Sequence, residues 1–484
     1  MNKLISKYKN MSVTARASIW FLFCNLLQKG ISTITVPIFT RLLTTTEYGT
    51  YSLYLSWFNI LTIITSLNIY YGSFYNVLNR IRDNRKRNEY ISSMQGLTIT
   101  LTMILVIIFF PFQDFWSSVL GLDKLVIWML LLELLVEPAV QFWLSRQRFD
   151  FKYRPAVIIT SLKCILNPVL GLILVSINTS GRDTLRIFSV VLAELIIAGT
   201  LLVIQFIRGK QFFSKQHWKF ALGFNIPLLP HHLSGVLLNQ VDRVMIEIFD
   251  QRDKVGIYSV AYNIGLLIQL FTNALNSTLN PWTYDKLNKK DYKSIKKTTS
   301  MLLVLISTAI MCMLFFVPEL VMIFGGEAYY EAIYVVPPVA CSVFFIFMFN
   351  IFAIPQMYFE EQKMMSVASM TAAALNIVLN YIFINLFGYL AAGYTTLACY
   401  IAYSVGHYFF VRRVCKKEIG GVQLYDKRVI LPLSAFVIAS SVLFNFLYSV
   451  PMFIRYGLVL IIFVVLIIKR KTVLNVLKTL KKKK

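Results

Sequence analysis

Charged side chains lie inside several long apolar runs of this sequence. Three of them are basic, namely Lys29, Lys163 and Arg243. Five are acidic, namely Glu133, Glu137, Glu194, Asp242 and Glu247. Ionisable groups within membrane-spanning segments are rare, and they usually face a water-filled cavity or a charged partner. We therefore take these residues as the first candidates for a functional site.

The basic residues suit the binding of an anion. An ammonium or guanidinium group in a surrounding of low dielectric constant forms charge-assisted hydrogen bonds to phosphate oxygens. The residues alone leave alternatives open. Arg243 can be neutralised by Asp242, or by Glu247 one helical turn away. Lys163 can extend its flexible stem to the membrane surface, and Lys29 can pair with a glutamate of another segment.

Two polar stripes at helical spacing carry basic residues. The first contains Asn25, Lys29, Ser32, Thr33 and Thr40. The second contains Asn225, His232, Asn239 and Asp242. Arg243 and Glu247 lie next to this stripe on the surface of the same helix. Both segments also contain prolines, whose freed backbone carbonyls are tolerated at this depth where they line a cavity or pack on protein. We expect these two segments to face one another across a polar cavity.

The acidic residues admit two roles. A desolvated carboxylate can take up a proton or a sodium ion and so couple transport to an ion gradient, or it can serve as the counter-ion of a nearby cation. His231 and His232 are further candidates for anion binding or proton transfer. The chain has only four histidines, without ligand spacing, and we expect neither a metal site nor a cofactor.

Long apolar segments must position all of these residues. The chain is 57% hydrophobic and 15% charged, and runs of about 20 apolar residues, the length that crosses a bilayer core, recur throughout. The pattern predicts an all-α polytopic membrane protein with 14 transmembrane helices. The expected helices are 17–40, 48–79, 91–111, 119–144, 155–177, 185–207, 222–249, 255–281, 298–324, 331–356, 364–386, 389–411, 429–448 and 452–468.

Basic residues are distributed unequally between the predicted helices. With the N-terminus in the cytoplasm, 38 of the 48 Lys and Arg residues fall in cytoplasmic segments, as the positive-inside rule requires. Arg182 and Arg186 are among the few assigned to outer segments. Both termini are therefore expected in the cytoplasm. The net charge of +25 reflects this topology and an attraction to anionic headgroups, so no nucleic-acid partner is expected.

The orientation also orders the basic residues by depth. At a rise of about 1.5 Å per residue, we expect Lys163 toward the cytoplasmic side, Lys29 near the middle and Arg243 toward the outside. Cations at rising depths predict a ladder of sites for an anionic group that crosses the membrane.

An internal repeat organises the chain. The sequence GTYS at 49–52 recurs as GIYS at 256–259, and Gly181 matches Gly388, both at an offset of 207 residues. Leu-Asn at 166–167 recurs at 375–376, an offset of 209. Such repeats are typical of transporters. We expect six-helix lobes at 1–207 and 222–411, a cytoplasmic linker at 208–221, and two more helices with a basic tail at 412–484.

Signatures of catalysis are missing from the sequence. It contains no GxxxxGK[ST] phosphate loop, no HExxH, no GxSxG and no nucleophile beside a base. No outer segment is long enough to carry the paired acids that we would expect of a glycosyltransferase or polymerase. We therefore expect a transporter and not an enzyme.

Several stretches resemble the polysaccharide flippases of the multidrug, oligosaccharidyl-lipid and polysaccharide exporter superfamily. They are "TVPIFTRLLTTTEYGTYSLYLSW", "IPLLPHHLSGVLLNQVDRVMI", "KVGIYSVAYNIGLLI", "ALNIVLNYIFI" and "GYLAAGYTTLACY". The most specific part is Asp242-Arg243 followed by Val255-Gly256-Ile257-Tyr258-Ser259. The resemblance covers nearly the whole chain.

The resemblance implies two six-helix lobes in a V-shaped arrangement with alternating access, plus two C-terminal helices. It implies translocation of an undecaprenyl-diphosphate-linked oligosaccharide repeat unit to the outer leaflet of the bacterial inner membrane, for O-antigen or capsule assembly. The residues expected to bind the substrate are Lys29, Arg243, Lys163, His232, Asn25 and Asn239. We expect a monomer surrounded by membrane lipids, with polymerase and chain-length proteins as candidate partners.

Other functions fit the sequence less well. Multidrug exporters of the superfamily rely on an acidic cavity with few cations, and the deep Lys29 argues against them. The lipid II flippases carry an arginine-rich cavity, whereas this chain has fewer arginines there. A membrane glycosyltransferase or polymerase that uses the same lipid carrier is the alternative from another class.

Overall fold

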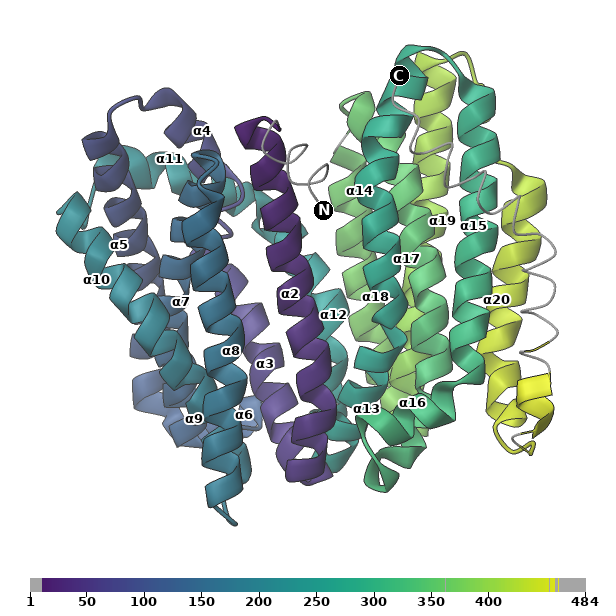
Figure 1. Ribbon diagram of the computed structural model, residues 1–484, viewed down its shortest axis with the longest axis horizontal. Helices are drawn as coiled ribbons and strands as arrows, with labels where there is room; N and C mark the ends of the chain where they lie inside the picture. Colours follow the sequence, from purple (N-terminus) through teal and green to yellow (C-terminus); the bar gives the residue numbers. More distant parts are fainter. Residues whose placement is uncertain (1–10, 362, 452, 458–459, 461–484) are drawn as a thin grey trace, which may run out of the picture. The chain divides into compact units, whose positions relative to one another are not determined.

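The computed structural model describes residues 11–361, 363–451, 453–457 and 460 (Figure 1). Throughout this described part the chain is helical and contains no β-strand, which confirms the predicted all-α class. Ten helical segments within it are long and apolar enough to cross a membrane. The chain divides into two compact units, Met1–Gln240 (unit 1) and Val241–Lys484 (unit 2).

Unit 1 is built from helices, most of which correspond to predicted spans. They are α2 (Val13–Leu42), α3 (Thr45–Ser66), α4 (Ser73–Arg80), α5 (Asn84–Phe109), α6 (Gln113–Leu120), α7 (Lys124–Phe149), α8 (Tyr153–Ile177), α9 (Arg182–Glu194), α10 (Thr200–Gly209) and α11 (Lys215–Asn225). A π-helical turn, Leu195–Gly199, joins α9 to α10. The next helix, α12 (Leu229–Phe249), crosses the division between the units.

The predicted helix 48–79 is wrong as a single element. Helix α3 begins at a capping box, in which Thr44 and Glu47 bond to each other's backbone N–H groups. It ends at Leu67, which adopts a left-handed conformation with φ of 47°, as does Asn68 with φ of 51°. The turn that follows brings Phe74 against the ring of Phe142 on α7, at 5.1 Å between centroids. Burial of these aromatic side chains outweighs continuation of the helix.

Packing in unit 1 centres on α7. Helices α3, α5 and α9 contact α7, while α8 packs against α2 and α9, and α10 packs against α5. Helix α11 begins within the predicted linker 208–221, yet it packs against α4 and α5. The Trp218 indole N–H donates to the backbone carbonyl of Ser93 at 2.9 Å, which fixes α11 to the body of unit 1.

The helices of unit 2 pack around one helix without charged residues, α17 (Val336–Tyr358). The other described helices are α13 (Arg252–Gly265), α14 (Leu267–Asn288), α15 (Tyr292–Phe315), α16 (Val317–Phe324), α18 (Lys363–Phe387), α19 (Leu390–Glu418) and α20 (Lys427–Leu447). Helix α17 contacts α13, α14, α15, α19 and α20 (Figure 1). Gly265 allows the approach of α13, because a Cβ atom there would lie 2.6 Å from Val339. Most of the predicted helix 452–468, and the terminal lysines, lie outside the described residues.

The residues that predict the internal repeat occupy corresponding places in the two units. Gly181 precedes α9 and Gly388 precedes α19, and both are left-handed, with φ of 62° and 70°. A side chain at either position would be strained, which explains the choice of glycine. Tyr51 lies on α3, the helix that follows α2, and Tyr258 lies on α13, the helix that follows α12. Helix α2 carries the first polar stripe, and α12 carries the second apart from Asn225.

Candidate functional site

Lys29 lies near the middle of α2, the longest helix of unit 1, and its side chain is exposed. Its ammonium has no hydrogen bond or ion pair with any residue that the structure describes. The Ser32 and Thr33 hydroxyls of the same stripe donate to the Lys29 backbone carbonyl, at 2.9 and 2.8 Å. Asn25, one turn earlier, is exposed as well. This part of α2 therefore offers a charge and an amide to a ligand.

Lys163 on α8 is paired instead. Its Nζ lies 2.9 Å from the carboxylate of Glu194, the last residue of α9. The Glu194 side chain is only 3% exposed, and that of Lys163 is 29% exposed. The positive charge of Lys163 is therefore matched within unit 1.

Two further carboxylates lie on α7 near this ion pair. Glu133 accepts a hydrogen bond from the Tyr54 hydroxyl of α3, and Glu137 Oε1 accepts one from Gln141 at 2.6 Å. Glu137 Oε2 is buried and has no partner. Lys163 interacts electrostatically with Glu133, Glu137 and Glu194. We call these three glutamates and Lys163 the acidic cluster; its negative charges exceed its positive one, which suits uptake of a proton or small cation.

A buried arginine of unit 1 escaped the sequence-based prediction. Arg186 was assigned to an outer segment, but it is 3% exposed on α9. Its guanidinium donates to Asn167 Oδ1 and Ser189 Oγ at 2.9 Å, and to the Tyr51 hydroxyl at 3.1 Å. It also lies over the ring of Phe39 at 4.0 Å. No carboxylate of the described chain forms an ion pair with it, so hydrogen bonds and aromatic rings alone stabilise its charge.

In unit 2, Asp242 on α12 is completely buried. Its carboxylate accepts hydrogen bonds from the Tyr258 hydroxyl, from Asn380 Nδ2 at 2.6 Å and from Thr396 Oγ1 at 2.7 Å. Asn376 Nδ2 lies 3.4 Å away. These partners come from α13, α18 and α19, so the carboxylate is the meeting point of four helices.

The Asp242 surroundings have the chemistry of a site for a small hard cation. The Asn376 Oδ1 atom is buried and has no partner, while Nδ2 of the same side chain faces the carboxylate. Carboxylate, carboxamide and hydroxyl oxygens are the ligands that hard cations prefer. Tyr258 and Asn376 stood out in the sequence only as residues of the internal repeat, and Asn380 and Thr396 did not stand out, because they lie far along the chain from Asp242.

Arg243 and Glu247 have separate partners. Arg243 is 7% exposed, donates from Nε to Ser259 Oγ at 3.0 Å, and lies over the ring of Tyr262 at 4.6 Å. The carboxylate of Glu247 accepts from Arg252 Nε at 3.0 Å. Arg243 is therefore held in place by α13, within the body of unit 2.

The second polar stripe is interrupted. Asn225 ends α11 and is buried, where it donates to Ser73 Oγ at 2.6 Å. The turn at Ile226–Leu228, which contains Pro227, separates it from α12. On α12, His232 is half-buried beside His231, with ring centroids 5.6 Å apart. Asn239 donates to the Gly235 carbonyl at 2.7 Å.

Solved structures of two membrane transport proteins share this fold. The chain resembles the lipid II flippase MurJ in an inward closed conformation, with a TM-score of 0.71 and 12% identity over 94% of this chain and 99% of that one. It also resembles an inward-facing multidrug resistance transporter of the MATE family, with a TM-score of 0.61 and 12% identity over 81% and 96% of the two chains. The protein thus has the fold of the multidrug, oligosaccharidyl-lipid and polysaccharide exporter superfamily.

Sequence comparison gives the family. Residues 14–285 match the polysaccharide biosynthesis protein family, and residues 227–382 match the MatE family. The chain belongs to the polysaccharide biosynthesis protein family, which confirms the resemblance seen in its sequence. It is 23% identical over 399 residues to a probable low-salt glycan biosynthesis flippase, Agl15 of Haloferax volcanii, covering 81% of this chain and 82% of the relative. It is 25% identical over 166 residues to Lsg locus putative protein 1 of Haemophilus influenzae, covering 32% and 39%.

Proposed function

We propose that the protein is a flippase for a lipid-linked oligosaccharide and not an enzyme. Its substrate would be an undecaprenyl-diphosphate-linked repeat unit, moved from the cytoplasmic to the outer leaflet of a bacterial inner membrane for O-antigen or capsular polysaccharide. Membership of the polysaccharide biosynthesis family supports this proposal, as does similarity to a relative named as a glycan biosynthesis flippase. Both termini would lie in the cytoplasm, and the protein would act as a monomer that hands its product to polymerase and chain-length partners.

The exposed ammonium of Lys29 carries the proposal. A diphosphate that leaves the headgroup region loses its hydration and needs positive charge to replace it. Lys163 is occupied by Glu194, and Arg243 is fixed against Ser259 and Tyr262. Lys29 has no such engagement with the described residues, so we assign it the main contact with the diphosphate. Asn25 would assist it from the preceding turn, while His232 and Asn239 remain secondary candidates.

Two groups of carboxylates are candidates for energy coupling. Asp242 would bind the coupling cation, a sodium ion or a proton, because its oxygen-rich surroundings and the unpartnered Asn376 Oδ1 fit a small cation. The acidic cluster of unit 1 would hold a further proton close to Lys163. In this assignment Glu133, Glu137 and Glu194 act as counter-ions and proton carriers, and Glu247 serves only to neutralise Arg252.

A transport assay tests the role of Lys29. The full-length protein would be reconstituted in vesicles with a fluorescent lipid-linked oligosaccharide, and the fraction reached by a membrane-impermeant quencher would be followed over time. We expect Lys29→Ala to slow the exchange at least about tenfold, the equivalent of one lost charge-assisted hydrogen bond. Lys29→Arg should restore most of the rate, because it keeps the charge.

Lys219→Ala serves as the matched control, since this exposed lysine of α11 lies outside the apolar segments. Its exchange rate should equal that of the unmodified protein. A Lys29→Ala variant with the unmodified rate would contradict the role of the ammonium. Absence of exchange in the unmodified protein, or an increase in oligosaccharide length, would contradict the flippase function itself.

A further inference from the structure

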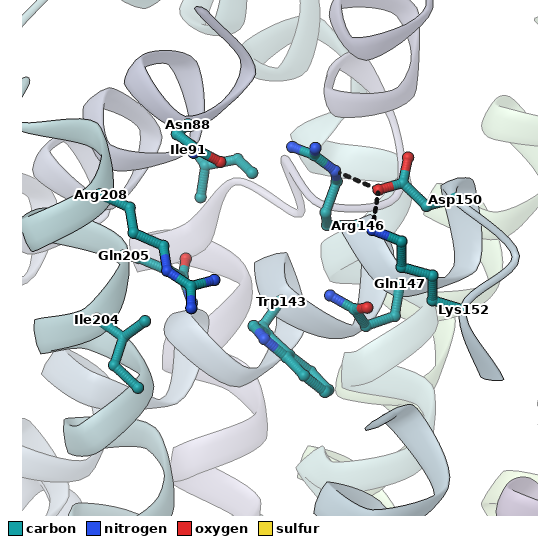
Figure 2. A pocket seen from close by; sticks show the side chains of 10 residues that line it. All are labelled: Asn88, Ile91, Trp143, Arg146, Gln147, Asp150, Lys152, Ile204, Gln205 and Arg208. Carbon is teal, nitrogen blue, oxygen red and sulfur yellow. Dashed lines mark hydrogen bonds and ion pairs between the residues drawn. The ribbon is translucent and has the colours of Figure 1, made fainter. Parts of the chain in front are cut away.

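A small pocket opens within unit 1, and neither Lys29 nor any residue of the acidic cluster is among its described lining residues. It has a volume of about 120 Å³ and lies between α5, α7 and α10, beside the turn that joins α7 to α8 (Figure 2). Ligand pockets for whole small molecules are typically about 300–1,000 Å³. This pocket is therefore too small for an oligosaccharide, but a single compact group can enter it.

Positive charge predominates in its lining. Arg146, Lys152 and Arg208 line the pocket, and Asp150 is the one acidic residue among the described lining residues. The Asp150 carboxylate is already shared, since Arg146 Nε lies 2.7 Å from it and Lys152 Nζ 3.8 Å. Arg87, which does not line the pocket, lies 3.5 Å from the same carboxylate. The Asp150 carboxylate therefore already forms ion pairs with two cations of the lining and with a third cation outside it.

Several hydrogen-bond donors of the pocket are left without an acceptor. The Nη1 atom of Arg146 is buried and has no partner, in a side chain that is 11% exposed. Arg208 forms no ion pair or hydrogen bond within the described parts of the chain, and Figure 2 shows its guanidinium directed toward the space in front of Trp143. The carboxamides of Asn88 and Gln147 also line this space. Guanidinium groups can only donate, so Arg146 Nη1 and Arg208 suit a negatively charged acceptor other than Asp150, whose carboxylate is already shared.

A phosphate group fits these requirements. It is compact, it carries negative charge, and its oxygens accept hydrogen bonds from several donors at once, with arginine as a preferred partner. The pocket residues come from segments that the distribution of basic residues assigns to the cytoplasmic side, where lipid phosphates are abundant.

We propose that the pocket formed by Arg146, Lys152 and Arg208 binds the phosphate of a lipid in the cytoplasmic leaflet. That phosphate belongs either to the diphosphate of the transported lipid before it enters the membrane or to an anionic phospholipid headgroup. The first source rests on the proposed function, whereas phosphate binding itself does not.

Binding of inorganic diphosphate to the purified full-length protein, measured by titration calorimetry at low salt, tests the proposal. The test variant is Arg208→Gln, because this exposed side chain holds no other described residue in place. We expect its affinity to fall at least about tenfold, as for the loss of one charge-assisted hydrogen bond. The matched control is Arg154→Gln, an exposed arginine on the same side of unit 1 that does not line the pocket. Its affinity should stay within about twofold.

Equal affinities of Arg208→Gln and the unmodified protein would overturn the proposal, as would an unmodified protein that binds no diphosphate. Competition then distinguishes the sources. Displacement of diphosphate by farnesyl diphosphate supports the transported lipid, and displacement by phosphatidylglycerol vesicles, but not by phosphatidylcholine vesicles, supports a phospholipid. If neither displaces it, the lipid assignment is overturned. Repeating the Arg208→Gln comparison in the Lys29→Ala protein separates this pocket from the contact assigned to Lys29. The same fall in affinity supports the pocket, and no fall overturns it.

Discussion

The side chains at the repeat positions surround a buried charge in each unit, a positive one, Arg186, in unit 1 and a negative one, Asp242, in unit 2. In unit 1, Tyr51 and Asn167 accept hydrogen bonds from the guanidinium of Arg186. In unit 2, the tyrosine and the asparagine at the repeat positions, 207 and 209 residues further along, donate to the carboxylate of Asp242. A hydroxyl and a carboxamide can each donate or accept, so the same pair of side chains stabilises either charge.

The comparison separates a structural charge from an exchangeable one. In unit 1 the polar side chains surround a cation that is part of the chain itself, and Arg186 thereby ties α3 and α8 to α9. In unit 2 they surround an anion, and a buried carboxamide oxygen of Asn376 beside it has no partner. We therefore expect a mobile cation to bind at Asp242, while the corresponding place in unit 1 is permanently filled by a guanidinium.

The largest effect is expected from removing the cation of unit 1. Arg186→Met leaves the oxygens of the half-buried Asn167 and Tyr51 without their donor, and each unsatisfied buried group costs about 1–3 kcal/mol. We expect a loss of about 2–4 kcal/mol in the free energy of unfolding, seen as a lower melting temperature of the purified protein. Arg182→Met is the control, because the Arg182 side chain donates only to the backbone carbonyls of Asn178 and Leu42, at the ends of α8 and α2. Equal losses in the two variants would contradict a special role for Arg186.

Removal of the anion of unit 2 is expected to affect transport more than stability. Asp242→Asn keeps the shape of the side chain, and the hydroxyls of Tyr258 and Thr396 can rotate to suit it. We expect the exchange of lipid-linked oligosaccharide under an imposed sodium or proton gradient to slow at least about tenfold, and the dependence on that gradient to disappear. Asp253→Asn, on the first turn of α13, should retain both. An Asp242→Asn variant that still responds to the gradient would disprove cation binding at this residue.

A matched pair of tyrosines gives the smallest and sharpest test. Tyr51→Phe and Tyr258→Phe each delete one hydroxyl at a repeat position, and each should lower the free energy of unfolding by about 1 kcal/mol. Only Tyr258→Phe should also change the cation concentration that gives half-maximal exchange, by about fivefold. If Tyr51→Phe changes that concentration equally, the two sites do not differ in the way proposed.

Much of the fold was accessible from the sequence, because apolar runs and the spacing of basic residues reflect the membrane directly. The break at Leu67 and Asn68 was not, since neither residue is a glycine or proline and only the packing of Phe74 on Phe142 requires the turn. Arg186 was missed for a related reason. It lies one helical turn after Arg182, near the start of its helix, where a sequence gives no sign of which side chain points inward.

Contacts between helices were the least accessible part of the site. The pairing of Lys163 with Glu194 joins residues 31 positions apart on different helices. On sequence grounds Glu133, Glu137 and Glu194 were equally good partners for Lys29. The structure assigns Glu194 to Lys163 and leaves Lys29 exposed. Composition and periodicity identify which charges lie in the membrane, whereas tertiary packing determines which of them neutralise each other.

The π-helical turn Leu195–Gly199, after Glu194, restricts the number of residues between α9 and α10 as well as their types. A π-helical turn contains one residue more than the α-helical register, and each residue rotates a helix by about 100°. Before the turn Glu194 meets Lys163, and after it Gln205 bonds to Gln95 and to the Ala139 carbonyl, both at 2.9 Å. Deletion of a single residue between Glu194 and Gln205 would rotate Gln205 away from Gln95 and Ala139 while Glu194 still faces Lys163. Homologous chains that retain both contacts should therefore keep this spacing, even where every exposed residue within the turn has changed.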